Sequence, residues 1–152
     1  MSFTKVIAFE EGFRSKPYKC SSGYPTIGYG IKLANKSANI DNFDCEIPEP
    51  VARLWLESHA LKEEAKLCQY AWFIDQRKDV QDILVSMCYQ LGLHGLLGFK
   101  NMIKALSVND METAATEALD SKWARSDSPS RAQRHARVIK GESINDVYSG
   151  LI

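Results

Sequence analysis

The stretch from Glu11 to Gly30 reads EGFRSKPYKCSSGYPTIGYG and decides how the N-terminal part of the chain folds. The polar turn SSG precedes the strand-like run TIGYG, so this stretch predicts a tight hairpin. Glu11 ends a short amphipathic segment, whereas Cys20 and Thr26 lie on the hairpin. A carboxyl that faces two small polar groups across a cleft suits acid-assisted hydrolysis, because one side donates a proton and the other holds water.

This spacing, a Glu followed nine residues later by Asp or Cys and six after that by Thr, resembles the signature of bacteriophage-type lysozymes, the T-even phage endolysin family of muramidases. Two further segments are similar to that family in order and spacing, and the resemblance covers nearly the whole chain. These segments are Tyr89-Gln90-Leu91-Gly92 with Gly95 and Gly98-Phe99, and Ser121-Lys122-Trp123 followed by Pro129, Arg131 and Arg134.

The resemblance implies that Glu11, Cys20 and Thr26 are catalytic. Glu11 would be the general acid, which must hold a proton near neutral pH; burial favours this and a neighbouring cation opposes it. In the family an Arg of the C-terminal helical region pairs with this Glu, and Arg131 is at the matching position. The hydroxyl of Thr26 can donate and accept, so it can position the attacking water. Without the motif, Glu11 would be interpreted as a surface residue and Thr26 as a β-branched strand residue.

Cys20 departs from most of the family, which carries Asp at this position. An ordinary thiol has a pKa of about 8.5 and is mostly neutral at pH 7. We expect an ionised Glu11 nearby to raise the pKa of Cys20 further. Cys20 is therefore a weak base, a partial thiolate or a small polar group beside the water; a buried, inert Cys is the alternative.

A second group of residues is expected to bind substrate: Gly30, Tyr24, Ser86, Gln90 and Arg131. Gly28 and Gly30 would let a sugar or backbone approach closely, although simple bulge geometry is the alternative. Gln90 and Ser86 would lie on the far wall of the cleft, and hairpin tyrosines either stack on sugars or pack locally. The isolated histidines and the absence of a CxxC pair predict no metal site.

The pattern predicts an α+β fold of lysozyme type. We expect a small sheet lobe at about 13–50, a connecting helix at about 50–70, and a helical lobe at about 71–152 that also includes the N-terminal helix. Gly12 would end the N-terminal helix, and Pro17 to Leu33 would form an antiparallel sheet followed by a loop.

Helical spacing is clearest in the second half of the chain. A stripe from Val80 to Leu91 predicts the centre of the core, and three glycines at 92, 95 and 98 should break the chain into short pieces. Asn109 to Glu112 resembles a capping box, and Ser128-Pro129 starts another helix. In the connecting helix an apolar face is expected from Val51, Leu54, Trp55, His59, Leu61 and Ala65.

Composition narrows the function classes. The chain has 152 residues, is 45% hydrophobic and has a formal net charge of zero, which argues against a nucleic-acid binder. Nothing is long and apolar enough for stable insertion in a membrane. Residues 121–140 hold six basic residues against one acidic, which predicts either attraction to anionic cell wall or a solvated helix surface. The four cysteines should be free thiols, with Cys68 and Cys88 in the core.

The leading interpretation is a monomeric peptidoglycan hydrolase without cofactor that cleaves between N-acetylmuramic acid and N-acetylglucosamine, with inversion implied by the family. A lytic transglycosylase on the same fold is the alternative, because that reaction needs no second carboxylate. A catalytically weak wall-binding protein is a third. The N-terminus lacks the layout of a secretory signal, so we expect a protein held in the host bacterial cytoplasm that reaches the periplasmic wall after release. The resemblance alone implies a holin as export helper.

Overall fold

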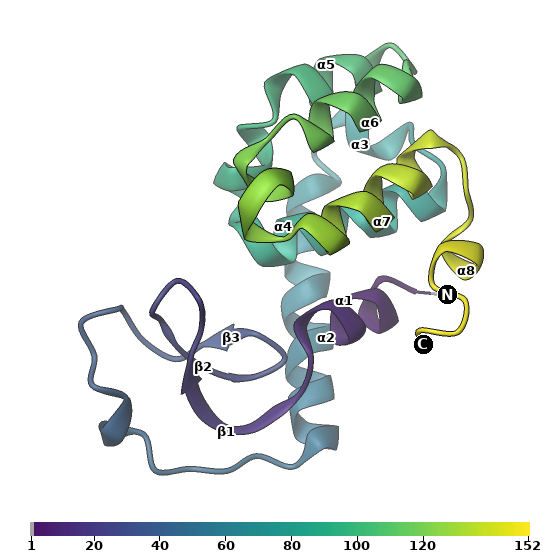
Figure 1. The fold of residues 1–152 in the computed structure, drawn as a ribbon. Coiled ribbons are helices and arrows are strands. Elements are labelled where there is room, and N and C mark those ends of the chain that lie inside the picture. The colour runs from purple at the N-terminus through teal and green to yellow at the C-terminus, as the bar shows by residue number, and fades with distance from the viewer. Residues whose placement is uncertain (1) are drawn as a thin grey trace.

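A computed structural model describes residues 2–152 (Figure 1). Helix α1 (Phe3–Glu11) ends at Gly12, whose φ of 68° takes the chain out of the helix as predicted. A three-stranded antiparallel sheet follows, in the order β1 (Arg14–Lys19), β2 (Pro25–Gly28) and β3 (Ile31–Lys32). The predicted α+β class is confirmed, because the rest of the chain is mostly helical.

The register of the hairpin brings the two polar groups of the motif together. Tyr18 pairs with Thr26, and Thr26 pairs in turn with Lys32 of β3. Cys20 follows β1 directly, and its backbone N–H donates to the Tyr24 carbonyl at 3.0 Å. Cys20, just after β1, and Thr26 of β2 therefore lie close together at the turn end of the sheet.

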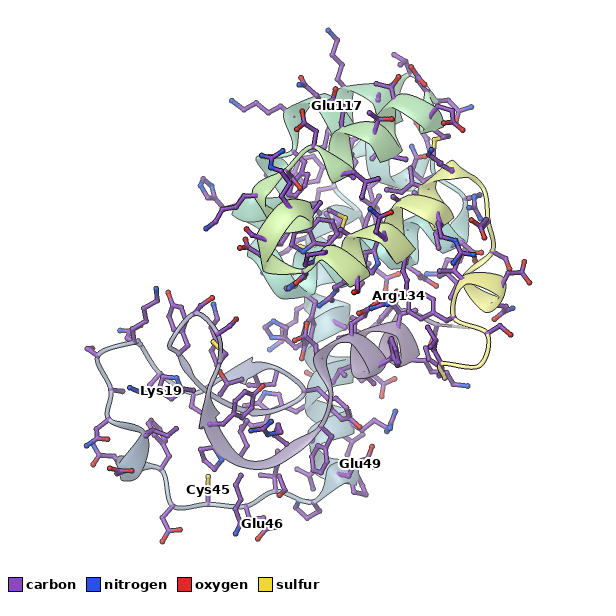
Figure 2. The ribbon with its side chains drawn as sticks, in the orientation of Figure 1. Lys19, Cys45, Glu46, Glu49, Glu117 and Arg134 are labelled. Carbon is purple, nitrogen blue, oxygen red and sulfur yellow. The ribbon has the colours of Figure 1, made fainter. Side chains whose placement is uncertain are left out.

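The segment between β3 and the next helix is an extended loop with one 3₁₀ turn, η1 (Ile40–Asn42), as expected. Asn39 caps this turn by accepting from the Asp41 N–H at 3.0 Å. Near its end, the Ile47 N–H donates to the Ser15 carbonyl at 3.0 Å, which ties the loop to β1. Cys45 and Glu46 lie on the outer side of this loop (Figure 2).

Helix α2 (Glu49–Leu67) runs from the sheet to the helical part of the molecule (Figure 1). Its buried residues are Ala52, Leu56, Ala60, Glu63 and Leu67. The apolar face predicted for this helix is wrong: Leu54 is 67% exposed, and Val51 and Leu61 are also exposed. This segment contains two sets of apolar residues with helical spacing. The set that packs on the core contains Ala52 and Ala60, whose small side chains allow close approach.

The helical part consists of α3 (Ala71–Ile74), α4 (Lys78–Leu97), α5 (Lys100–Ser107), α6 (Met111–Leu119), a π-helical turn (Trp123–Asp127), α7 (Pro129–Lys140) and α8 (Ile144–Val147). The predicted apolar stripe lies in α4 and is buried. Of the three glycines expected to break this region, Gly92 leaves the helical conformation, with a φ of 74° and a ψ of 163°. Gly98 follows the last residue of α4, whereas Gly95 remains within it.

The cap of α6 is displaced by one residue from the predicted position. Asp110, not Asn109, accepts the Thr113 N–H at 3.1 Å. Asn109 precedes the cap with a φ of 57°, a left-handed conformation that Asn tolerates better than most residues. Asn and Asp both cap helices well, so the sequence NDME allowed either start.

Helix α1 packs on the helical part, although the sheet follows it in the chain. Val6 belongs to a buried cluster with Ile83 of α4, Val138 of α7 and three residues at the C-terminus, Ile144, Val147 and Tyr148. The ring of Phe9 lies edge-on to that of Tyr148, with centroids 5.8 Å apart. The C-terminal end of α1 therefore lies where the helical part meets the sheet (Figure 1), and Glu11 is the last residue of this helix.

All four cysteines are free. Cys88 is buried as predicted, and its thiol donates to Glu63 Oε2 at 3.1 Å. The prediction that Cys68 is a core residue is wrong, because Cys68 is exposed at the C-terminal end of α2. Among residues 2–152, none of the helices combines the length and apolar character needed to cross a bilayer.

Gly28 tests how closely α2 packs on the sheet. A Cβ at Gly28 would lie 3.2 Å from Ile47 Cδ1 and 3.3 Å from Ala52 Cβ, at a φ of +65°. We expect Gly28→Ala to lower the free energy of unfolding by about 3 kcal/mol, from backbone strain plus overpacking. Gly23→Ala is the matched control, because Gly23 also has a positive φ but has open space around it; it should cost about 1 kcal/mol. Urea unfolding measures both, and equal losses would contradict the packing argument.

Candidate active site

A cleft of about 600 Å³ lies between the sheet, α2 and α4. Five of the predicted site residues line it: Glu11, Cys20, Thr26, Gly30 and Gln90. The other lining residues are Tyr18, Ser21, Ser22, Ile31, Lys32, Trp55, His59, Glu63, Tyr89, Leu91 and Gly92. The acid and the polar pair of the motif therefore open into one space.

Gly30 makes room for the carboxyl of Glu11. A Cβ at Gly30 would lie 2.5 Å from Glu11 Oε2 and 3.1 Å from Glu11 Cδ, at a φ of +73°. The group that approaches Gly30 closely within the protein is thus the acid itself, whereas the sequence predicted a sugar or backbone. Gly28 likewise faces the side chains of Ile47 and Ala52. Both glycines are explained by contacts inside the protein.

Arg131 of α7 forms the ion pair with Glu11 that the family resemblance implied. Its Nη1 donates to Glu11 Oε1 at 2.7 Å. The Arg131 side chain is 5% exposed, and it contacts the acid from behind the cleft. The structure therefore places Arg131 as the partner of Glu11 and not on the surface that a substrate would touch.

Cys20 has a lowered pKa, so the predicted direction is wrong. Burial raises the pKa of the thiol, but other contacts lower it by more. In decreasing order these are the backbone hydrogen bonds at Tyr24 and Ser22, the hydroxyl of Thr26 and the positive charge of Lys32. The motif shows how far Cys20 lies from Glu11 in sequence, but not the donors that the hairpin turn presents to the sulfur.

Thr26 has one hydroxyl proton and two acceptors within reach. The hydroxyl donates to the Tyr24 carbonyl at 2.8 Å, and the same proton, when turned toward the Cys20 sulfur, stabilises the thiolate instead. Thr26 is 2% exposed, so its orientation is set by these neighbours. Its remaining lone pairs can accept from a water molecule in the cleft.

The opposite wall of the cleft is rigidly hydrogen-bonded. Gln90 Nε2 donates to Ser128 Oγ at 2.7 Å, and Gln90 Oε1 accepts from Trp123 Nε1 at 2.9 Å. The hydroxyl of Tyr89 donates to the Tyr29 carbonyl at 2.6 Å, which links this wall to the sheet. Gln90 therefore faces the cleft with its amide orientation already fixed.

Two of the residues predicted to bind substrate lie away from the cleft. Ser86 is 0% exposed, so the prediction that it lies on the cleft wall is wrong; its hydroxyl contacts Arg131 and His135 instead. The ring of Tyr24 is outside the cleft lining, with the Lys32 ammonium 4.1 Å from its centroid.

Residues on α2 were missed by the sequence interpretation. Trp55, His59 and Glu63 follow one another at intervals of four residues, so they share one face of the helix, and that face lines the cleft. Glu63 is buried and accepts from Lys66 at 2.8 Å, and the His59 ring lies edge-on to Tyr89. Burial lowers the pKa of His59. The four-residue spacing of these aromatic and polar side chains could have indicated the cleft-lining face. It overlapped the apolar repeat that we assigned to the core.

The basic residues of the C-terminal segment do not form a free positive face. Each is within 4 Å of a carboxylate oxygen: Lys122 with Asp127, Arg125 with Asp120, Arg131 with Glu11, Arg134 with Glu10, Arg137 with Glu142, and Lys140 with Glu112. Figure 2 shows Arg134 beside α1. Attraction of anionic wall by this segment is therefore weakened by its own carboxylates.

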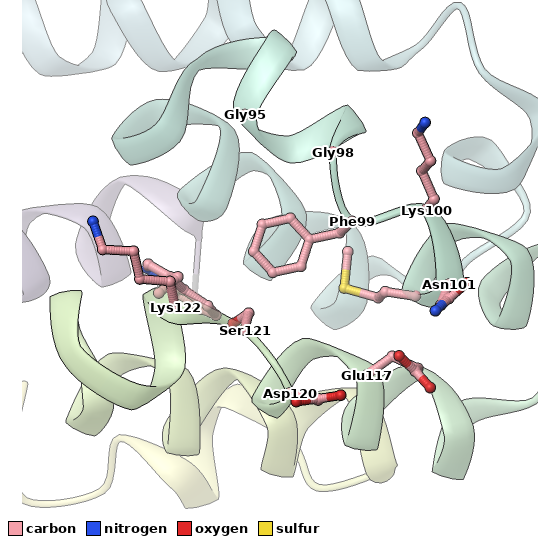
Figure 3. A pocket seen from close by; sticks show the side chains of 11 residues that line it. Gly95, Gly98, Phe99, Lys100, Asn101, Glu117, Asp120, Ser121 and Lys122 are labelled. Carbon is pink, nitrogen blue, oxygen red and sulfur yellow. The ribbon is translucent and has the colours of Figure 1, made fainter.

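A second cavity, of about 350 Å³, lies in the helical part between the end of α4, α5, α6 and the π-helical turn (Figure 3). It shares no lining residue with the cleft. Phe99 and Met102 contribute apolar surface, while Glu117 of α6 and Asp120, directly after that helix, line the other side. Among residues 2–152, no group of three or more histidine, cysteine or acidic side chains is placed to hold a metal ion.

Comparison with known proteins shows the family of this chain. The phage lysozyme family profile matches residues 8–138, which include all three residues of the motif and Arg131. The chain belongs to the phage lysozyme family. Phage lysozymes are glycoside hydrolases of the muramidase type.

Two relatives are equally similar to this phage lysozyme in sequence but differ in how much of their own length the match covers. A protein named probable T4-type lysozyme 1, from Dictyostelium discoideum, is 25% identical over 95% of this chain and 96% of its own length. The pre-baseplate central spike protein of Enterobacteria phage T4 is 25% identical over 91% of this chain. The match spans only 28% of the spike protein, so the likeness concerns one part of it.

The lowered pKa of Cys20 is open to a direct test. Alkylation requires the thiolate, so the alkylation rate of Cys20 should rise with pH. The midpoint of this rise should lie at a lower pH in the folded protein than in the urea-unfolded chain. Thr26→Val removes one of the groups that lower the pKa, so its midpoint should move to higher pH. Peptide mass spectrometry after timed iodoacetamide treatment separates Cys20 from the other cysteines. A midpoint unchanged by unfolding would contradict the hydrogen-bonding argument.

Proposed function

We propose that the protein hydrolyses peptidoglycan by cleaving the glycosidic bond between N-acetylmuramic acid and N-acetylglucosamine. The observation that carries this proposal is the cleft in which Glu11, held by Arg131, faces the same space as Cys20 and Thr26. Membership of the phage lysozyme family supports the same reaction class.

In the proposed reaction, Glu11 protonates the leaving glycosidic oxygen as the bond from the anomeric carbon to that oxygen breaks. A water molecule held by Thr26 attacks the opposite face of the anomeric carbon and gives up a proton. Cys20, with its lowered pKa, lies beside Thr26 to receive that proton as a thiolate. If Cys20 instead only stabilises the positive charge that develops on the sugar ring, the proton passes to bulk water. Attack on the opposite face inverts the anomeric configuration.

Two walls of the cleft provide surface for the glycan. The Gln90 amide is fixed by Ser128 and Trp123, which prepares it to hydrogen-bond an acetamido or hydroxyl group. Trp55, 41% exposed on α2, offers an aromatic face of the kind that sugars stack on. We infer that both residues bind substrate, whereas Arg131 acts through Glu11.

A lytic transglycosylase is the competing function, and Cys20 is the observation that favours it. In that reaction a hydroxyl of the substrate attacks the anomeric carbon, so no second carboxylate is needed. A protein that binds the wall without cutting it is less well supported, because the basic residues of the C-terminal segment are paired. We further propose that the protein acts as a monomer on the periplasmic wall after release from the host cytoplasm, with a holin-type helper.

Product analysis with a Glu11→Gln variant tests the proposal. Gln is isosteric with Glu but has no acidic proton to transfer, so we expect activity on purified peptidoglycan to fall by about 10³-fold. Mass spectrometry of the released muropeptides should show new reducing ends from the wild type. Glu142→Gln, on the exposed surface, is the matched control and should behave as wild type. Anhydro ends would identify a transglycosylase, and products from Glu11→Gln at the wild-type rate would overturn the proposal.

The role of Trp55 is tested by its removal from the cleft. We expect Trp55→Ala to raise KM for glycan chains about tenfold and to leave kcat within about twofold, because stacking stabilises substrate and transition state alike. Leu54→Ala is the matched control, since Leu54 is exposed on the same helix and does not line the cleft. Equal effects of the two substitutions would show that Trp55 does not contact the substrate.

A further inference from the structure

Ser86 and His135 form a buried polar pair behind the catalytic acid. Both residues are 0% exposed, and His135 Nε2 lies 3.0 Å from Ser86 Oγ. Neither residue lines the cleft. We propose that Ser86 and His135 are positioning residues that hold Arg131, and through it Glu11, in one orientation. This inference rests on the proposed function, in which Glu11 is the acid.

The orientation of Arg131 depends on few contacts. Nη1 donates to Glu11 at 2.7 Å, and Nη2 donates to the Ser86 carbonyl and to Ser86 Oγ, each at 2.9 Å. The buried Nε has no hydrogen-bond partner among the described residues. Ser86 therefore provides both contacts that oppose rotation of the guanidinium away from Glu11.

The hydrogen-bond donors and acceptors around Ser86 explain why its orientation depends on His135. Arg131 can only donate, so Ser86 Oγ must accept from it, and the Ser86 hydroxyl proton is free to point toward His135 Nε2. That nitrogen must then be unprotonated, which places the ring proton on Nδ1. His135 Nδ1 lies 3.3 Å from the Tyr148 hydroxyl oxygen, and that hydroxyl donates to Glu10 at 2.7 Å. This direction of the hydrogen bonds, with Ser86 donating to Nε2, requires a neutral His135.

The surroundings of His135 keep it neutral. Burial lowers its pKa well below the ordinary value, and the positive charges of Arg131 and Arg134 on the same helix lower it further. The other groups that face it are Ser86 of α4 and the Tyr148 hydroxyl, with Glu10 of α1 beyond Tyr148. A protonated ring could not accept from Ser86, so the low pKa preserves the contact across the working range of pH.

A packing role is the alternative for His135. Its ring lies edge-on to Trp123 with centroids 5.8 Å apart, so it also fills space in the core. If packing were its whole role, a substitution that keeps the volume would be tolerated whether or not it can accept a hydrogen bond. His135→Leu keeps approximate volume without an acceptor, and His135→Gln keeps an acceptor near the place of Nε2.

The kinetic test compares Ser86→Ala, His135→Leu and His135→Gln. We expect Ser86→Ala and His135→Leu to lower kcat about tenfold while KM changes less than about twofold, because a misplaced acid mainly affects the chemical step. His135→Gln should recover most of the loss. The other groups near Glu11 are Tyr89 and Tyr18, which these substitutions leave in place.

Controls separate positioning from loss of structure. Ser130→Ala removes an exposed hydroxyl one residue before Arg131 and should match wild type. Circular dichroism confirms folding at the assay temperature; if His135→Leu does not fold, Ser86→Ala and His135→Gln decide the outcome. The double variant Ser86→Ala with His135→Leu should be no worse than the worse single variant, because both act through one contact. Additive losses in kcat would overturn the proposal.

A measurement independent of activity keeps the two proposals distinguishable. In ¹⁵N NMR spectra, the Nη–H signals of a fixed Arg131 should be resolved in the wild type, in Ser130→Ala and in His135→Gln. They should be averaged or lost in Ser86→Ala and His135→Leu. If these signals behave as expected but the wild type releases no product, the proposed function fails and the positioning of Arg131 stands. Arg131 signals that persist in Ser86→Ala, with unchanged kcat, would overturn the positioning role.

Discussion

The ion pair between Glu11 and Arg131 is the constraint on which the rest of the site depends. It joins residues 120 positions apart and nearly removes the guanidinium from water. A charge buried in this way destabilises the fold unless its partners compensate for the lost hydration. Gly30 leaves room for the carboxyl, and Ser86 satisfies the other side of the guanidinium. A substitution at any of these positions therefore changes the position or the surroundings of the Glu11 carboxyl.

A second ion pair lies immediately beside the first and fixes how α1 sits on α7. Glu10 accepts from Arg134 Nε at 2.8 Å and from its Nη2 at 2.7 Å, while Glu11 takes Arg131, one helical turn earlier. Two consecutive carboxylates are thus matched to two arginines three residues apart. The apolar cluster around Val6 and Tyr148 holds the two helices together. Because apolar contacts are not directional, the paired charges set the register between the helices.

The sequence predicted the parts of this protein that depend on local chain geometry. The helix that ends at Gly12, the hairpin and the order of Glu11, Cys20 and Thr26 are all local, and a known spacing marks them. The buried face of α2 could not be predicted, because two stripes with the same helical period compete and only the tertiary contact selects one. The direction of the Cys20 pKa shift and the burial of Ser86 failed for the same reason: both depend on groups that the fold brings together.

The position of α1 also has a consequence for how the protein is assembled. Helix α1 is made early by the ribosome, yet its partners Arg131, Arg134 and Tyr148 are among the late residues of the sequence. Contacts between such distant segments form slowly, because a large loop must close before they stabilise anything. The acid therefore stays without its arginine until residue 131 has been made and has folded back onto α1. A nascent chain that has not yet reached residue 131 has the hairpin but lacks a completed catalytic centre.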